Sequence, residues 1–208
     1  MWTPLLLTLF VGSATAYGKF PGERQLEVLR RQATVAADGS TAEPKPAVAV
    51  LAAGCFWGVE LAFQRLPGVV QTEVGYTGGN VRDPTYQMVT RGDTMHAEAI
   101  KVTYDSAVIS LKDLLSVFMD AHDPTHKNRQ GNDVGTQYRS AIFVNDDEER
   151  AIAEDAIAAE QKRLGKPVAT TVEALSTFYP GEEYHQGYLA QRGQTAEKGA
   201  EVPIRCYG

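Results

Sequence analysis

An uninterrupted apolar run that passes directly into an amphipathic segment decides how the folded part of this chain begins. Residues 47–53 read Ala-Val-Ala-Val-Leu-Ala-Ala, which predicts a buried strand, and residues 59–66 have the spacing of an amphipathic helix. Between them stands Gly-Cys-Phe-Trp-Gly at residues 54–58. We therefore expect Cys55 at the N-terminus of a helix, where unpaired backbone N–H groups favour a thiolate over a thiol.

Cys55 has two interpretations at this point. A cysteine beside a strand is most often a small apolar core residue. Here glycines flank the Cys-Phe-Trp triplet, and they permit a tight turn and leave the sulfur approachable. Phe56 and Trp57 are large enough to wall an apolar site beside the sulfur. The combination favours a reactive cysteine.

The rest of the sequence alternates between strand and helix patterns. Ser110 has the position of an N-cap before an apolar helical stripe. The order β-α-β-β-α-β-α-β contains a split β-α-β unit. We therefore predict an α+β fold: a ferredoxin-like two-layer sandwich with helices on a mostly antiparallel sheet, long functional loops and a coiled C-terminal tail. The further expected elements are strands at residues 69–76, 96–104, 140–145 and 168–175, and helices at 111–119 and 146–165.

The first 46 residues differ in composition from the rest. Residues 1–16 carry no charged side chain and end in Ala-Thr-Ala after an apolar stretch, which predicts a cleavable signal peptide too short to span a membrane. Residues 17–46 are polar and rich in Ala and Pro, as in a linker or pro-segment. The folded domain is expected at 47–208, with a flexible tail from about 190. The leader predicts a secretory or extracellular destination, with an organelle or the cytoplasm as the alternative.

Charge and cysteine content exclude several classes of protein. The net charge of −6 argues against nucleic acid or an anionic membrane as a partner. Cys55 and Cys206 are the only cysteines, too few for a disulfide scaffold or a four-cysteine zinc site. The two can still form one pair, structural or catalytic. His122 and His126 share a loop with no further clear ligand, so no metal site is expected.

Three further stretches place polar side chains at predicted loops and strand ends. Glu98 falls early on the alternating strand 96–104; if part-buried, its carboxyl stays protonated more easily and can act as an acid, whereas the alternative is a solvent-facing Glu. Residues 130–140 crowd polar side chains between glycines, a density more typical of a binding loop than of a turn. Tyr86, taken alone, is best explained as a surface-packed aromatic.

Together these motifs resemble peptide methionine sulfoxide reductase, class A. The resemblance runs from about residue 47 to residue 188, with the motifs in the order of the family. It implies an enzyme that reduces the S epimer of methionine sulfoxide, free or in proteins. The matching stretches are Gly-Cys-Phe-Trp-Gly at 54–58, Gly-Tyr-Thr-Gly-Gly at 75–79, Asp-Pro-Thr-Tyr at 83–86, Gly-Asp-Thr-Met-His-Ala-Glu at 92–98, Gly-Thr-Gln-Tyr-Arg-Ser at 135–140 and Tyr-His-Gln at 184–186.

The resemblance assigns a role to each site residue. Cys55 matches the nucleophile, and Glu98 matches the acid that protonates the sulfoxide oxygen. Attack by Cys55 releases methionine and leaves a sulfenic acid, which a second thiol converts to a disulfide. Cys206 is the candidate for that thiol, and external thioredoxin or dithiothreitol restores the enzyme without a bound cofactor or metal. The substrate-binding residues are Phe56 and Trp57 against the S-methyl group, Tyr86 and Tyr138 as hydrogen-bond donors to the oxygen, and Asp133 in the polar network.

Two other classes remain open from the residues alone. A permanent disulfide between Cys55 and Cys206 would suit a secreted binding module. A thiol hydrolase would need His96 or His185 as a base near Cys55. The reductase is expected to be a monomer whose partners are oxidised proteins or free methionine-S-sulfoxide and a thioredoxin-like reductant. One position departs from the family pattern, because Met95 stands where many members have Gly before His-Ala-Glu.

Overall fold

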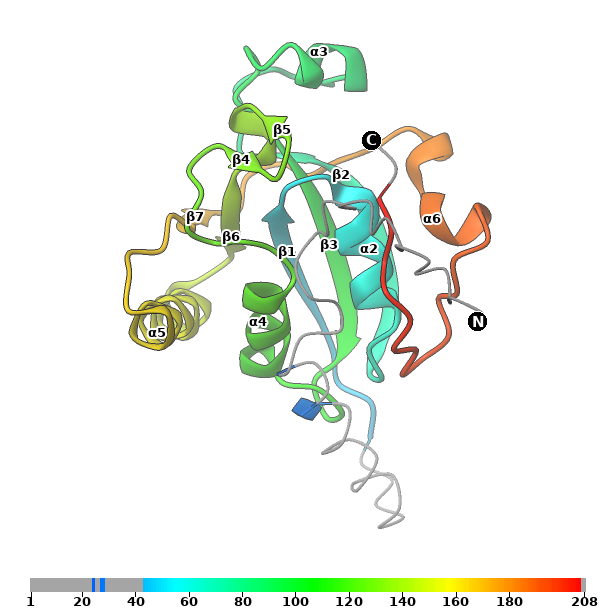
Figure 1. Ribbon diagram of the computed structural model, residues 1–208, viewed down its shortest axis with the longest axis vertical. Coiled ribbons are helices and arrows are strands. Elements are labelled where there is room, and N and C mark those ends of the chain that lie inside the picture. Colours follow the sequence, from blue (N-terminus) through cyan, green and yellow to red (C-terminus); the bar gives the residue numbers. More distant parts are fainter. Residues whose placement is uncertain (1–23, 25–26, 29–42, 207–208) are drawn as a thin grey trace, which may run out of the picture.

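The computed structural model of the protein describes residues 24, 27, 28 and 43–206 (Figure 1). The predicted leader and most of the predicted linker lie outside these residues and stay predictions. The elements are β1 (Pro46–Ala53), α2 (Phe56–Gln64), β2 (Val69–Thr77), α3 (Tyr86–Thr90), β3 (Ala97–Asp105), α4 (Leu111–Asp120), β4 (Arg129–Gln130), β5 (Asp133–Val134), the 3-10 turn η1 (Thr136–Tyr138), β6 (Ser140–Val144), α5 (Asp147–Leu164), β7 (Thr171–Ala174), β8 (Tyr179–Pro180), the 3-10 turn η2 (Glu183–His185) and α6 (Tyr188–Gln191).

The main sheet confirms the predicted α+β class. Within the described residues it has six strands in the order β7-β6-β1-β3-β2-β8, and the pairs formed among its central four strands, β6-β1-β3-β2, are all antiparallel. This is the strand order of the split β-α-β unit, with α2 and α4 as the connecting helices. Only β7 pairs in parallel, alongside β6. The short elements α3, β4, β5 and β8 were not expected, because two to five residues are too few to show a periodic pattern.

The strand β1 lies inside the sheet, and its residues 49–53 are buried on both faces. Leu51 and Ala53 belong to the main core, which also contains side chains from α2, α4 and α5. Val50 and Ala52 belong to a second cluster with Phe143 on the opposite face. A strand covered on both sides needs apolar residues at consecutive positions. This explains why residues 47–53 form an uninterrupted apolar run instead of alternating.

The helix ends follow the expected local chemistry. The hydroxyl of Ser110 accepts a hydrogen bond from the backbone N–H of Asp113, which confirms Ser110 as the N-cap of α4. Asp146 caps α5 in the same way, and α5 ends at Gly165 in the left-handed conformation with φ 65°. No helix in the described part of the chain is long and apolar enough to cross a membrane.

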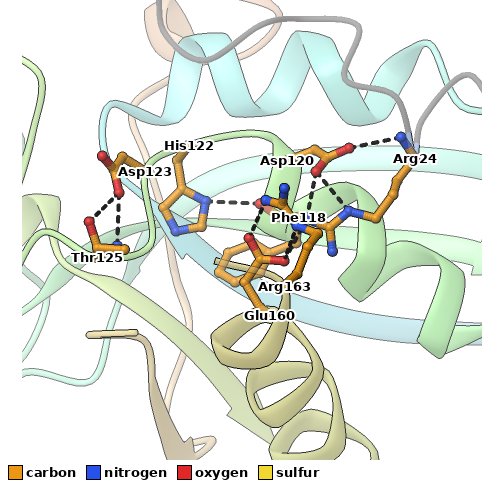
Figure 2. A network of polar contacts seen from close by, with 8 residues as sticks. All are labelled: Arg24, Phe118, Asp120, His122, Asp123, Thr125, Glu160 and Arg163. Carbon is orange, nitrogen blue, oxygen red and sulfur yellow. Dashed lines mark hydrogen bonds and ion pairs between the residues drawn. The ribbon is translucent and has the colours of Figure 1, made fainter. Parts of the chain in front are cut away.

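Two residues from the predicted linker contact the domain. Arg24 reaches the C-terminal end of α4 and the C-terminal part of α5, where its guanidinium pairs with Asp120 and, at 2.7 Å, with Glu160 (Figure 2). The carboxylate of Glu160 is fully buried and also binds Arg163. Val28 is 2% exposed and belongs to the main core. At these two positions the segment before the domain packs on it.

The tail after α6, residues 192–206, has no regular secondary structure, as expected. It is nevertheless docked on the domain. Figure 1 draws it in red alongside α2, and Ile204 is buried in the main core. Its contacts bring Cys206 to the site described next.

Candidate active site

Cys55 stands at the turn from β1 into α2, as predicted. Gly54 makes that turn with a φ of 89°, a conformation that strongly favours glycine. Cys55 is the N-cap residue and α2 begins at Phe56, so the sulfur lies at the helix N-terminus. The helix starts earlier than the amphipathic pattern at 59–66 indicated, because its first turn packs Phe56 into the core.

The ionisation of Cys55 differs from the expectation. Its sulfur lies 3.9 Å from that of Cys206, and the two share a hydrogen bond. That hydrogen bond, burial and the charge of Glu98 together raise the pKa of Cys55, although the backbone N–H of Trp57 acts in the opposite direction. The helix N-terminus therefore does contribute as predicted, but it is outweighed. Our expectation of a favoured thiolate at Cys55 is wrong for the enzyme in this state.

The pKa of Cys206 is lowered, which is the shift that was expected for Cys55. The hydrogen bond with Cys55 lowers the pKa of Cys206, and the backbone N–H of Gly58 in the first turn of α2 lowers it further, against the effect of burial. The two thiols are not joined in a disulfide in this structure. Their hydrogen bond and shared burial couple the ionisation of one sulfur to that of the other.

Glu98 lies on β3 and is only 2% exposed. One carboxyl oxygen accepts a hydrogen bond of 3.1 Å from the backbone N–H of Phe56. Burial raises the pKa of Glu98 to about 8, and the nearby Asp133 and Cys206 act in the same direction. The carboxyl is therefore largely protonated at neutral pH. A solvent-facing Glu98, the alternative in the sequence, is wrong.

Tyr86 and Tyr138 gather around the same carboxyl. Tyr86 is the first residue of α3, and Tyr138 is the last residue of η1. Burial and the charge of Glu98 raise the pKa of Tyr86 to about 12 and also raise that of Tyr138, so both phenols keep their O–H groups. Asp133 on β5 contributes to the shifts of both phenols and of Glu98. The structure thus brings these predicted residues together from four segments of the chain.

Phe56 and Trp57 form an aromatic wall at the start of α2, with ring centroids 6.2 Å apart. Phe56 is 1% exposed. Trp57 is half-buried and stacks on Tyr188 of α6, with the ring centroids 3.9 Å apart and the planes at 11°. The indole therefore has a fixed orientation, one face against Tyr188.

Two residues of the segment after β8, His185 and Glu182, hold this wall and Tyr86 in place, a role that the sequence did not indicate for either. The indole N–H of Trp57 donates to Nδ1 of His185 at 3.1 Å, and His185 is 1% exposed. Glu182 accepts hydrogen bonds from the backbone N–H of Tyr86 at 2.8 Å and from the hydroxyl of Tyr76 at 2.7 Å. The Tyr-His-Gln motif at 184–186 was the only signal in the sequence that this segment belongs to the site.

Both histidines proposed as a hydrolase base have partners other than Cys55. Nδ1 of His96 accepts a hydrogen bond from the backbone N–H of Gly79, and its Nε2 lies 2.8 Å from the carbonyl oxygen of Val81. Nδ1 of His185 accepts from Trp57, and its Nε2 lies 3.8 Å from a carboxyl oxygen of Glu182. Within residues 43–206 and the few described before them, no group of three or more His, Cys, Asp or Glu side chains has the arrangement of a metal site.

Met95 adopts the backbone conformation that a glycine would favour. Its φ is 59°, in the left-handed region. Its carbonyl oxygen accepts a hydrogen bond of 3.0 Å from the guanidinium of Arg139. The departure from the family pattern therefore leaves the turn before His-Ala-Glu in the left-handed form, with the side chain of Met95 half exposed.

Comparison with known proteins agrees with this site. The family model of peptide methionine sulfoxide reductase matches residues 47–204. Peptide methionine sulfoxide reductase A4, chloroplastic, from Oryza sativa subsp. japonica is 51% identical over 175 residues, which cover 80% of this chain and 66% of the rice protein.

Solved structures agree as well. Mxr1 from Saccharomyces cerevisiae in reduced form has a TM-score of 0.69 and 36% identity, covering 76% of this chain and 92% of the yeast chain. The same yeast protein in complex with Trx2 has a TM-score of 0.50 and 26% identity, covering 72% of this chain and 91% of that one. Because the family match spans almost the whole folded domain and includes every site residue except Cys206, the chain belongs to the peptide methionine sulfoxide reductase family of oxidoreductases, A type.

Proposed function

We propose that this enzyme reduces methionine-S-sulfoxide, free or in proteins, to methionine with Cys55 as the nucleophile. The observation that carries the proposal is the placement of Glu98. It is a buried, largely protonated carboxyl that is hydrogen-bonded to the residue next to Cys55. This hydrogen bond holds the acid on β3 next to the turn that carries the sulfur nucleophile. A sulfoxide sulfur is a poor electrophile until its oxygen is protonated or hydrogen-bonded, so the reaction requires both.

In the first step, one set of residues acts on the sulfoxide oxygen and Cys55 acts on the sulfoxide sulfur. The carboxyl of Glu98 and the phenols of Tyr86 and Tyr138 supply O–H donors to the sulfoxide oxygen, while the sulfur of Cys55 attacks the sulfoxide sulfur. In the net reaction the S–O bond of the substrate breaks, the substrate sulfur gains two electrons and leaves as methionine, and Cys55 becomes a sulfenic acid. A protonated Glu98 carries no charge, which removes one of the effects that raise the pKa of Cys55.

The second step uses Cys206. Its sulfur attacks the sulfenic sulfur of Cys55, a water molecule leaves, and a disulfide forms. The separation of 3.9 Å and the lowered pKa of Cys206 support this role. A dithiol reductant then regenerates both thiols. The complex of yeast Mxr1 with Trx2 supports a thioredoxin as that reductant, and dithiothreitol is expected to replace it in vitro.

Recognition of the substrate depends on the aromatic wall. We assign the S-methyl group of the substrate to Phe56 and Trp57, opposite the O–H donors. With the methyl group and the oxygen directed to different sides, only one arrangement around the chiral sulfur presents it to Cys55. The choice of the S epimer follows from the family resemblance.

Separate incubation with the S and R epimers of a methionine sulfoxide peptide, with dithiothreitol present, tests the proposal. We expect loss of the S epimer alone. Reduction of neither epimer would overturn the proposed function, and reduction of the R epimer would overturn only the stereochemistry. Cys55→Ser is the control, because it removes the nucleophile and leaves the remaining site unchanged.

The destination and assembly of the protein are also proposals. We propose a monomer that acts on oxidised proteins after the leader directs it out of the cytosol. The name of the rice relative places that protein in the chloroplast, which supports an organelle as the alternative to the secretory pathway. Fusion of residues 1–46 to a fluorescent protein distinguishes the two destinations.

A further inference from the structure

The C-terminal tail is held against α2 by an arginine that the reaction does not use. Arg65 is the C-cap residue of α2 and is 2% exposed. Its Nε donates to the carbonyl oxygen of Thr195 at 2.9 Å, and its Nη1 donates to that of Val202 at 2.5 Å. A buried guanidinium that binds two backbone carbonyls seven residues apart fixes the path of the chain between them.

Other contacts fasten the same part of the tail at the same end of α2. The backbone N–H of Gly199 donates to the carbonyl oxygen of Arg65 at 2.8 Å. The ammonium group of Lys198 donates to the carbonyl oxygens of Gln64 and Val69, both at 2.7 Å. The tail is therefore fixed to the C-terminal end of the helix, while the cysteine pair lies at its N-terminal end.

The length of the helix leaves little slack between these two points. From Cys55 to Arg65 the helix axis rises by about 15 Å, at about 1.5 Å per residue. From Val202 to Cys206 the chain advances by four residues, which span at most about 14 Å when fully extended. An extended segment from Val202 to Cys206 is therefore long enough to follow α2 from one end to the other and to bring the two sulfurs to 3.9 Å.

We propose that Arg65 positions Cys206 for disulfide formation by fixing Val202 at the far end of α2. Arg65 touches neither the substrate nor the sulfurs, so it is a positioning residue for the second step only. The inference rests on the proposed function, in which the Cys206 thiol attacks the sulfenic acid of Cys55 with loss of water. Gln194, which exchanges two hydrogen bonds with the backbone of Arg205, is a further clamp on the same segment.

The test separates the two chemical steps in a single turnover. Reduced enzyme is mixed with excess methionine-S-sulfoxide peptide in the absence of reductant, and both methionine and free thiols are followed with time. For Arg65→Met we expect methionine formation at the wild-type rate, one per enzyme. Disulfide formation should be slower by at least about tenfold, because the effective concentration of Cys206 at Cys55 falls. The sulfenic acid then accumulates and reacts with dimedone.

Two further variants complete the test. Lys112→Met, at an exposed position on α4, is the control for loss of a cation and should leave both steps unchanged. Arg65→Lys keeps the charge but replaces the two-pronged guanidinium by one ammonium group, and we expect an intermediate rate of disulfide formation. If Arg65→Met does not fold, Arg65→Lys carries the same test without opening a cavity.

Each other outcome contradicts a specific statement. Disulfide formation at the wild-type rate in a folded Arg65 variant would overturn the positioning role. An equal loss of both steps would also overturn it, since that indicates a general structural effect. Absence of a methionine burst in the wild-type enzyme would instead overturn the proposed function, and with it the role of Arg65 in the second step.

Discussion

Cys55 and Cys206 lie 3.9 Å apart, but the segments that carry them are built differently. Cys55 belongs to a junction between a buried strand and a helix, where hydrogen bonds of regular secondary structure define the backbone. Cys206 belongs to a tail without regular structure, held by side chains such as Arg65 that bind its carbonyl groups. Local sequence therefore places the nucleophile Cys55, whereas contacts between residues more than a hundred positions apart place its partner thiol, Cys206.

The first prediction concerns the separate tasks of the two cysteines, which are tested by removing each sulfur in turn. Cys55→Ser should reduce turnover to background, by at least about 10⁴-fold, because the hydroxyl is a poor substitute for the sulfur nucleophile. Cys206→Ser should release one methionine per enzyme and then stop when thioredoxin is the reductant. Quench-flow measurement of methionine checks both. A Cys206→Ser enzyme with no first turnover would show that the two cysteines do not have separate tasks.

The second prediction concerns Glu98, whose charge acts on Cys55 and which responds in turn to Cys206. Glu98→Gln should slow the first turnover by about a hundredfold or more, since the acid is lost while the size is kept. The ratio of wild-type kcat/KM to that of Glu98→Gln should fall as the pH rises through about 8, the pKa of the buried carboxyl, because only its protonated form donates to the sulfoxide oxygen. A pH profile with the same alkaline limb in Glu98→Gln would contradict this assignment.

The raised pKa of Glu98 also makes the stability of the folded protein depend on pH. The folded protein holds the proton of Glu98 up to a pH of about 8, whereas an ordinary glutamate loses it near 4.5. Between these values the folded state binds more protons, so the contribution of Glu98 to stability decreases as the pH rises. Denaturant titrations across this range should show a shallower decrease for Glu98→Gln than for the wild type.

The third prediction concerns the hydrogen bond by which His185 orients the indole ring of Trp57. His185→Phe keeps an aromatic ring but removes the acceptor for the indole N–H of Trp57. We expect about a tenfold loss in kcat/KM, carried mainly by KM, because a buried donor left unpaired costs roughly 1–3 kcal/mol and loosens the wall. His126→Phe, at a half-exposed loop position, is the control. An unchanged KM would show that Tyr188 stacking alone orients the indole.

The smallest expected effect is at Met95, a purely local feature. Its left-handed φ of 59° is strained for a side chain with a Cβ, so Met95→Gly should raise the free energy of unfolding by about 1 kcal/mol. Met95→Ala retains the Cβ and should give no such gain. Thermal unfolding of the two variants provides the measurement, and equal stabilities would mean that the turn carries no strain.

Much of the fold could be predicted because its signals are short-range. The capping group of Ser110, the acidic start of α5 and Gly165 at its end each satisfy backbone groups within a few residues. The strand β8 could not be predicted, because it exists only by pairing with the distant strand β2. The strands β4 and β5 pair with each other, but two residues each are too few to show a periodic pattern. Among the site residues, Tyr86 was recognisable only through the ordered motifs and not from its own loop.

The sequence alone determined most of the order of strands and helices and the turn that carries Cys55, because hydrophobic period, glycine placement and capping act over one or two turns of backbone. The residues around Cys55 were indicated by the family resemblance of the ordered motifs. Only the tertiary structure decided the ionisation of Cys55, where the tail lies and what orients Trp57. Those properties depend on burial and on hydrogen bonds such as that of Arg65 to Val202, and these arise when distant segments pack together.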